Sequence, residues 1–214
     1  TAIREIVIPE GVTVIQPYAF KNCVNLTTVS LPGTLTSVDE AAFYACSSLT
    51  GITLPDKVTT IGDYAFRKCT GLTAVTFGSG LLRIGESSFY GCTGITSLHI
   101  PEGVTVIQAY AFKGCTKLAD LSLPGTLTTI GDSAFHTCTS LKTIVIPAKV
   151  TGIGAYCFSG SYNLWKITFL GDAPAIGNYA FKGLAATAYY PGGNSTWTSA
   201  VRQNYGGTIT WKAN

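Results

Sequence analysis

The sequence contains no methionine, two histidines and few charged residues: Asp, Glu, Lys and Arg make up 12% of its 214 positions. Its 14 basic and 11 acidic residues give a formal net charge of +3, spread along the chain without runs of like charge. A protein that binds a phosphate backbone needs a dense basic footprint. We therefore expect no nucleic-acid partner.

Long apolar runs and targeting segments are also missing. A membrane-spanning helix needs about 20 consecutive apolar residues, and because no such stretch occurs, we expect no membrane insertion by this segment. The first residues, TAIREIVIPEG, lack the basic and hydrophobic regions of a signal peptide, and they lack an initiator methionine. We expect Thr1 to be a boundary within a longer protein.

Metal-binding patterns are absent as well. Two histidines support little metal chemistry, and the seven cysteines include no C-x-x-C pair. Six of the cysteines recur at a fixed spacing, which favours a core column of buried free thiols over disulfides or metal ligands. We expect no metal and no other cofactor.

What the sequence does contain is a repeat of 23 residues. The phenylalanine column is Phe20, Phe43, Phe66, Phe89, Phe112, Phe135, Phe158 and Phe181. The cysteine column is Cys23, Cys46, Cys69, Cys92, Cys115 and Cys138. The 15 residues from Pro9 to Cys23 return, with two changes, from Pro101 to Cys115. A period between about 20 and 50 residues is typical of stacked repeats, so we predict eight units over residues 3–186.

Each unit is expected to contain short strands joined by turns. In LTTVSLPG, Val29 and Leu31 alternate with hydroxylated residues, as in a strand, and the Pro-Gly pair favours a turn. The stretch DEAAFYAC is predicted to form a short helical or 3₁₀ turn with Phe43 and Cys46 on one side. Stacked units would cover one another at the spacing of parallel strands, about 4.8 Å. The predicted fold class is therefore an α/β solenoid.

The string IGDYAFRKCTGLTAVTF, from Ile61 to Phe77, and its copies resemble the units of the BspA-like leucine-rich repeat family. The resemblance covers residues 3–186 and is weakest in the last two units, where Ser161 and Leu184 replace cysteine. It implies a curved, right-handed horseshoe, extracellular or displayed on the cell surface. It also implies adhesion to proteins of a host or a neighbouring cell.

The tail after residue 186 breaks the period. Because an open solenoid end exposes its core, we predict that residues 187–214 form a C-terminal cap. Ser195 or Thr196 is expected to begin a short helix that ends at Asn204, and the segment TITW is expected to form a final strand.

Five aromatic residues gather toward this end of the chain. They are Trp165, Tyr189, Tyr190, Trp197 and Trp211. Two interpretations stay open: the rings seal the last rung, since aromatic side chains bury large areas, or they form a platform on which sugar rings stack.

The three residue types of a hydrolase triad also occur close together on the predicted sheet. If strand faces alternate, Ser122, His99 and Asp120 point outward on adjacent rungs, and these are triad residue types. However, the repeat places hydroxylated residues at this position in most units, and a flat sheet lacks an oxyanion hole and a pocket. We therefore predict no catalytic residues and no enzymatic activity.

The outward columns of the predicted sheet form the candidate protein-binding face. They are Thr28, Ser30, Thr53, Thr76, Ser97, His99, Asp120, Ser122, Thr143, Lys166 and Thr168. Solenoids use such extended surfaces for binding, although short hydroxylated residues also suit any exposed strand. Three hypotheses remain: a non-enzymatic module that binds proteins through this face, a structural spacer in a larger surface protein, and a glycan binder that uses the C-terminal aromatic residues.

A second row of large side chains follows the phenylalanines by one position. It consists of Lys21, Tyr44, Arg67, Tyr90, Lys113 and His136. We expect cations to stack on rings along this row, which would stiffen the array or contact a partner.

Overall fold

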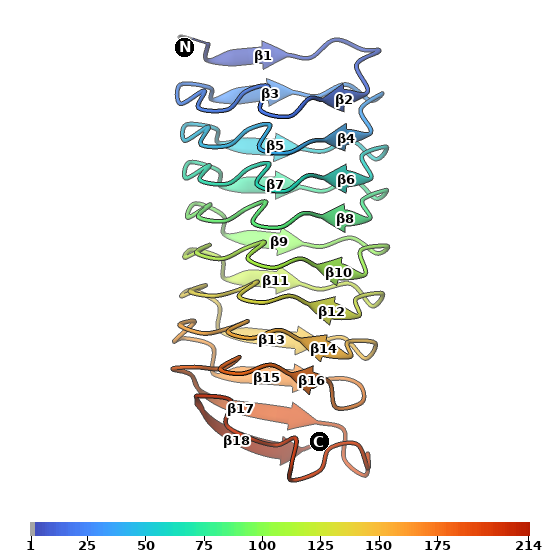
Figure 1. Cartoon of the computed structure of the whole chain (residues 1–214), viewed down its shortest axis with the longest axis vertical. Helices are drawn as coiled ribbons and strands as arrows, with labels where there is room; N and C mark the ends of the chain where they lie inside the picture. The colour runs from blue at the N-terminus through green and yellow to red at the C-terminus, as the bar shows by residue number, and fades with distance from the viewer. Residues whose placement is uncertain (1–2) are drawn as a thin grey trace.

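The protein is a parallel β-solenoid in the computed structural model, which describes residues 3–214. Its rungs follow one another along the long axis in chain order (Figure 1). The first row of strands is β1 (Glu5–Val7), β3 (Thr28–Ser30), β5 (Gly51–Thr53), β7 (Ala74–Thr76), β9 (Ser97–His99), β11 (Asp120–Ser122), β13 (Thr143–Ile146), β15 (Lys166–Phe169), β17 (Ala185–Tyr190) and β18 (Thr208–Ala213).

The second row forms one continuous eight-stranded sheet. Its strands are β2 (Val14–Ile15), β4 (Ser37–Val38), β6 (Thr60–Ile61), β8 (Arg83–Ile84), β10 (Val106–Ile107), β12 (Thr129–Ile130), β14 (Gly152–Ile153) and β16 (Ala175–Ile176). Paired strands in both rows are parallel with the predicted offset of 23 residues, as in Ile61 with Ile84. The exception is β15 with β17, where Lys166 lies opposite Thr187. In the first row the pairs are β1 with β3, β5 with β7 and β9 with β11, followed by a four-stranded sheet of β13, β15, β17 and β18.

The core is built from the predicted columns. The phenylalanine rings from Phe20 to Phe181 stack in one line, with neighbouring centroids between 5.1 and 6.2 Å apart. All of these rings except the half-buried Phe20 are completely buried. The stacked-rung arrangement is therefore confirmed, because like side chains share one environment from rung to rung.

The expectation of helical turns is wrong, since no helix occurs within residues 3–214. The stretch around Phe43 does make single-turn bonds, such as the one from the Cys46 N–H to the Phe43 carbonyl. The Phe43 N–H, however, donates to Ala65 on the next rung. Ala41 and Ala45 adopt φ values of 50° and 57°, a left-handed conformation that ends a right-handed helix. The fold is a β-solenoid, not an α/β structure.

The predicted helix in the tail is also wrong. Asn194 accepts hydrogen bonds from both the N–H and the hydroxyl of Thr196, so the segment begins with a side-chain-stabilised turn, and turns continue to Gly207. The expected final strand is present as β18, which pairs with β17. The predicted boundary between repeats and cap, at residues 186 and 187, falls within β17 and stays a prediction.

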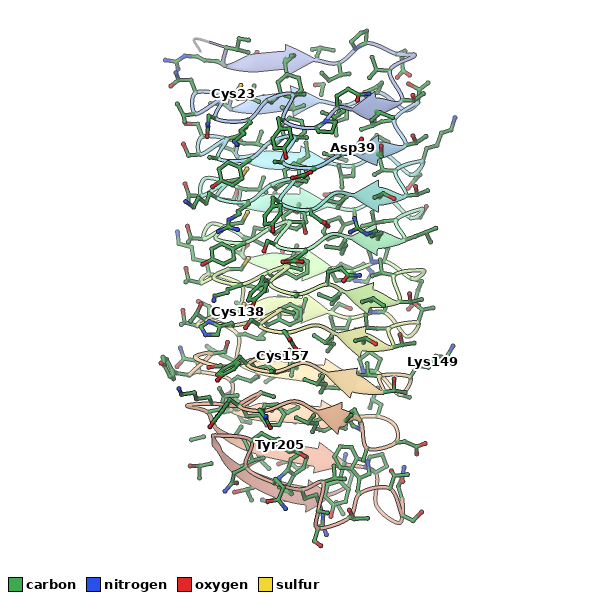
Figure 2. The ribbon with its side chains drawn as sticks, in the orientation of Figure 1. Cys23, Asp39, Cys138, Lys149, Cys157 and Tyr205 are labelled. Carbon is green, nitrogen blue, oxygen red and sulfur yellow. The ribbon has the colours of Figure 1, made fainter. Side chains whose placement is uncertain are left out.

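All seven cysteines are buried, and none of them is part of a disulfide. Figure 2 shows Cys23 and Cys138 on different rungs of the same stack. Each thiol from Cys46 to Cys138 donates to the backbone carbonyl oxygen 26 residues earlier, with sulfur–oxygen distances of 3.0 to 3.4 Å. The column is therefore a structural ladder. Separately, a membrane-spanning helix is not found in the part of the chain that the structure describes.

Candidate binding surface

The outward side chains of the first row of strands form one surface, which we call the sheet face. It holds every predicted binding residue: Thr28, Ser30, Thr53, Thr76, Ser97, His99, Asp120, Ser122 and Thr143 are exposed, and Lys166 and Thr168 are half-buried. Residues between them, such as Leu98 and Ile144, are buried. The alternation of a strand therefore brings the predicted residues together on one side.

Hydroxyl groups on the sheet face differ in their hydrogen bonding from the hydroxyl groups beside it. Thr27, Thr50 and Thr73 stand just before the strands and donate to backbone carbonyls of the preceding rung, at 2.9, 3.3 and 2.9 Å. By contrast, the hydroxyls of Ser30 and Thr76 make no hydrogen bond within residues 3–214, and the same holds for Thr28, Thr53, Ser122, Thr143 and Thr168. The sheet face thus presents donors and acceptors that the protein itself does not use.

The three residue types of a hydrolase triad do not assemble into one. Ser122 lies opposite His99, while Asp120 lies opposite Ser97. Among the described residues, no hydrogen bond links His99 to Ser122 or to Asp120. A triad needs an oriented base beside its nucleophile, so this geometry supports no acyl transfer.

A shallow hollow interrupts the sheet face over β5 and β7. It has a volume of about 420 Å³ and is lined by residues that include Ser30, Gly51, Thr53, Ala74 and Thr76. Gly51 and Ala74 make the hollow because they occupy the position at which neighbouring rungs carry Thr28 and Ser97. Neither residue was predicted from the sequence, although their small size within that column was the available signal.

Most of the C-terminal aromatic residues seal the core. Trp197 is only 4% exposed, packs edge-on against Phe169 at 4.8 Å and stacks with Tyr190 at 5.3 Å. Its indole N–H donates to the Gly171 carbonyl at 3.0 Å, and Trp211 stacks on Phe169. The sealing interpretation is confirmed for these rings, and a glycan platform that uses Trp197 is wrong because that ring is covered.

Tyr189 belongs to the sheet face instead, and Trp165 lies beside that face, just before β15. Trp165 is 55% exposed, and the Lys166 ammonium nitrogen lies 5.4 Å from the centre of the Tyr189 ring. Lys212 lies opposite Tyr189 on β18 and extends the surface further. Lys212 was not predicted from the sequence, because the shorter step between β15 and β17 displaces the repeat by two residues.

The row beside the phenylalanine column makes the expected cation–ring contacts. Lys21 lies 5.3 Å from the Tyr44 ring centre, and Arg67 lies 4.4 Å from that of Tyr90. Burial and the neighbouring Lys113 lower the pKa of His136, so this histidine is neutral near pH 7. Since these rings face cations of their own chain, the row contributes to rung-to-rung packing.

The described residues do not bring together side chains that could bind a metal ion. Across residues 3–214, groups of three or more His, Cys, Asp or Glu side chains able to hold an ion do not occur. The carboxylates Glu10, Asp56 and Glu102 instead accept hydrogen bonds from backbone N–H groups one rung later. These acids therefore hold neighbouring turns together.

Two rows of parallel strands, a sealed core and one open sheet define a solenoid repeat protein. The family model for the BspA type leucine rich repeat region matches in six copies, over residues 1–119 and 60–188. The chain belongs to the BspA-type leucine-rich repeat family. No curated protein matches it.

Solved structures of bacterial proteins share this fold. A leucine-rich repeat protein from Bacteroides ovatus is 26% identical, with a TM-score of 0.72 over 99% of this chain and 61% of its own. A leucine rich cell surface protein from Faecalibacterium prausnitzii is 29% identical, with a TM-score of 0.73 over 89% of this chain and 64% of its own. The chain thus spans less than two thirds of the length of either relative.

Proposed function

We propose that this chain is a non-enzymatic binding module that recognises protein partners through its sheet face. The observation that carries the proposal is the difference between two sets of hydroxyls. Those of the flanking threonines are used in bonds to backbone carbonyls, whereas those of the sheet face have no partner within residues 3–214. Unused donors and acceptors on a rigid, extended surface are what a protein partner needs for hydrogen bonding.

The rigidity of the surface supports the same proposal. The strands beneath it rest on the phenylalanine stack, and the carboxylates of Glu10 and Glu102 tie turns of adjacent rungs together. A rigid surface loses little conformational entropy on binding. Recognition therefore requires no refolding of this chain.

Binding by purified extracellular-matrix and cell-surface proteins tests the proposal. A variant of the sheet face combines Ser30→Lys, Thr76→Lys, Ser122→Lys and Thr168→Lys. A control variant with the same added charge combines Gln16→Lys, Thr70→Lys, Asn178→Lys and Ser199→Lys, all exposed and outside the sheet face. We expect capture by the native chain and by the control variant, and loss of capture in the sheet-face variant. Equal capture by both variants would discard the sheet face as the binding surface.

A structural spacer is the second candidate, and the cation–ring row favours it. Lys21 lies over both Tyr18 and Tyr44, and Arg67 lies over both Tyr64 and Tyr90. Such contacts join neighbouring rungs and stiffen the array. In this case a flanking domain would carry all recognition, and deletion of that domain from the full-length protein would abolish capture while the repeats stay folded.

We also propose that the chain acts outside the cell or on the cell surface. The supporting observation is the Faecalibacterium prausnitzii relative, which is described as a cell surface protein. Protease treatment of intact cells that express the full-length protein tests the location. Loss of the protein from intact cells is expected, and full protection until lysis would contradict the proposal.

A further inference from the structure

The charges of this protein are not spread evenly along the solenoid. Residues 133–214 contain six Lys or Arg and one acidic residue, Asp172, whereas residues 1–132 contain eight Lys or Arg and ten Asp or Glu. The formal net charge is therefore +5 for the C-terminal segment and −2 for the remainder. The total of +3 hides two regions of opposite sign.

Lys166 and Lys212 lie on the sheet face, and Lys142 lies beside it in the column of Thr27, Thr50 and Thr73. Lys142 directly precedes β13, Lys166 begins β15, and Lys212 lies in β18. The segments 142–146, 165–169, 185–190 and 208–213 contain no Asp or Glu. Within residues 3–214 the only salt bridge joins Arg83 to Asp63 on earlier rungs. Lys142, Lys166 and Lys212 therefore carry charges that no salt bridge pairs among the described residues, although Asp120 lies on the neighbouring strand β11 and Glu102 interacts with Lys149.

A hollow of mixed polarity lies at the beginning of the strands in this region. It has a volume of about 340 Å³ and is lined by Trp165 together with Ala185, Thr187, Thr208, Thr210 and Ala186. Small residues on β17 and β18 leave room beside the indole, which is 55% exposed. Tryptophan beside a hollow is a frequent centre of binding energy in protein interfaces.

A second hollow, which is mainly apolar, lies at the other end of the strands. It has a volume of about 520 Å³, and its lining includes Val145, Pro147, Lys149 and Leu170. Val145 and Leu170 are 50% and 55% exposed. Val145 takes the place of the hydroxylated residues Ser122 and Thr168 of neighbouring rungs, and Leu170 takes the place of the proline of most rungs. Both departures from the repeat make this corner more apolar.

We propose that this region binds an acidic, extended segment of a partner protein, with apolar side chains in the two hollows and carboxylates beside the lysines. We call it the basic end of the sheet face: Lys142, Val145, Lys149, Trp165, Lys166, Leu170 and Lys212. The inference rests on the proposed function and adds the chemistry of the partner. Opposite charges steer association and fix the orientation of the bound segment.

The dimensions favour a peptide segment. The hollows lie about two rungs and about five strand positions apart, or about 18 Å, which an extended chain of about five or six residues spans. A sulfated polysaccharide would meet the lysines but would leave the apolar hollow beside Val145 and Leu170 unfilled. A polypeptide supplies both kinds of group.

Selection from a random peptide library displayed on phage, with the native chain as the target, tests the inference. We expect the selected peptides to be enriched in Asp and Glu together with Leu, Ile or Phe. A synthetic copy of the commonest selected peptide should bind more weakly as the salt concentration rises, because salt screens exposed charges. Selected peptides without acidic enrichment would overturn the inference.

Variants locate the site. The variant Lys142→Gln/Lys166→Gln/Lys212→Gln should weaken binding of this peptide by about tenfold or more. Trp165→Ala should do the same, and it leaves the core intact because the ring is largely exposed. A control with the same loss of charge, Lys57→Gln/Lys68→Gln/Lys182→Gln, lies outside the sheet face and should bind as the native chain does.

Other outcomes separate this inference from the proposed function. Binding that is lost in the variant with lysines at Ser30 and Thr76, but not on changing Lys166 or Trp165, rejects the basic end and keeps the sheet face. Heparin binding that depends on the lysines but not on Trp165, without acidic peptides in the selected pool, identifies a polyanion site and rejects the peptide. If no sheet-face substitution changes the binding of peptides or proteins, both proposals are rejected.

Discussion

The thiol of Cys92 donates a hydrogen bond to the backbone carbonyl oxygen of Phe66, with a sulfur–oxygen distance of 3.0 Å. The same bond recurs down the cysteine column, and at Ser161 a hydroxyl takes the place of the thiol, 2.9 Å from the Phe135 carbonyl. From Cys46 to Ser161 this position therefore holds a small buried donor, whereas the last unit carries the buried Leu184 there. Sulfur itself is not needed.

The stability of Cys92 variants should depend on whether the new side chain can donate this hydrogen bond. Cys92→Ser keeps the donor and should change the free energy of unfolding by less than about 1 kcal/mol. Cys92→Ala removes the hydrogen bond and leaves a small cavity, so we expect a loss of about 1–2 kcal/mol. Urea unfolding of both variants measures the difference, and a serine variant that is less stable than the alanine variant would contradict the donor argument.

Alkaline pH should destabilise the fold through these thiols. Burial raises the pKa of Cys92 and of Cys138 from 9.0 to about 12. The unfolded chain therefore loses these protons first, so the stabilisation is complete below pH 9.0 and is lost as pH rises toward about 12. Within that window, each thiol should lower the free energy of unfolding by about 1.4 kcal/mol per pH unit. Urea unfolding measures this effect. Between about pH 7 and about pH 10, the free energy of unfolding should decrease less for Cys92→Ser/Cys138→Ser than for the native chain.

The phenylalanine stack should be most sensitive in its middle. Phe89 is fully buried, between Phe66 and Phe112 at 5.2 and 5.4 Å, so Phe89→Ala should cost about 3–5 kcal/mol. Phe20 is half-buried with one stacked neighbour, and Phe20→Ala should cost about 1–2 kcal/mol. Thermal and urea unfolding compare the two variants. Equal losses would mean that the rings do not act as one continuous core.

Left-handed backbone positions offer a way to stabilise the protein. Thr137 has a φ of 57°, at the position where other rungs carry Gly91, Gly114 and Gly160. A β-branched residue is strained in that conformation, so Thr137→Gly should raise the free energy of unfolding by about 1 kcal/mol.

The matched control is Gly114→Ala at the equivalent position. Its φ is 76°, and an added Cβ would meet no atom closer than 3.7 Å. The control should therefore lose about 1 kcal/mol from backbone strain alone. Thermal unfolding measures both variants, and a loss of stability in Thr137→Gly would show that the threonine contacts outweigh the strain.

The sequence was a good guide wherever a structural property repeats with the chain. The spacing of Phe43, Phe66 and Phe89 predicted one stack, because identical residues can lie above one another only if every coil has the same length. The alternation of Ser97, Leu98 and His99 predicted the sheet face for the same kind of reason, since neighbouring strand residues point to opposite sides. Both the core and the candidate surface were therefore accessible before the structure.

The sequence was a poor guide where local and long-range hydrogen bonds compete. The stretch DEAAFYAC has a composition that suits a helix, but the N–H of Phe43 bonds to the next rung instead of to its own turn. The tail misled for a related reason, because the shorter step from β15 to β17 moved Tyr189 and Lys212 onto the sheet face. Neither the hydrogen bond to the next rung nor the shorter step can be predicted from the sequence of a single repeat.

By itself, the sequence determined the length of a rung, the residues that fill the core and the side of each strand that faces outward, since all three follow from periodicity. Only the tertiary structure decided that the turns are not helical, that Trp197 is covered while Trp165 is exposed, and that lysines of separate rungs share one surface. These features depend on what lies above and below each coil. Contacts between residues more than 20 positions apart in the chain decide them.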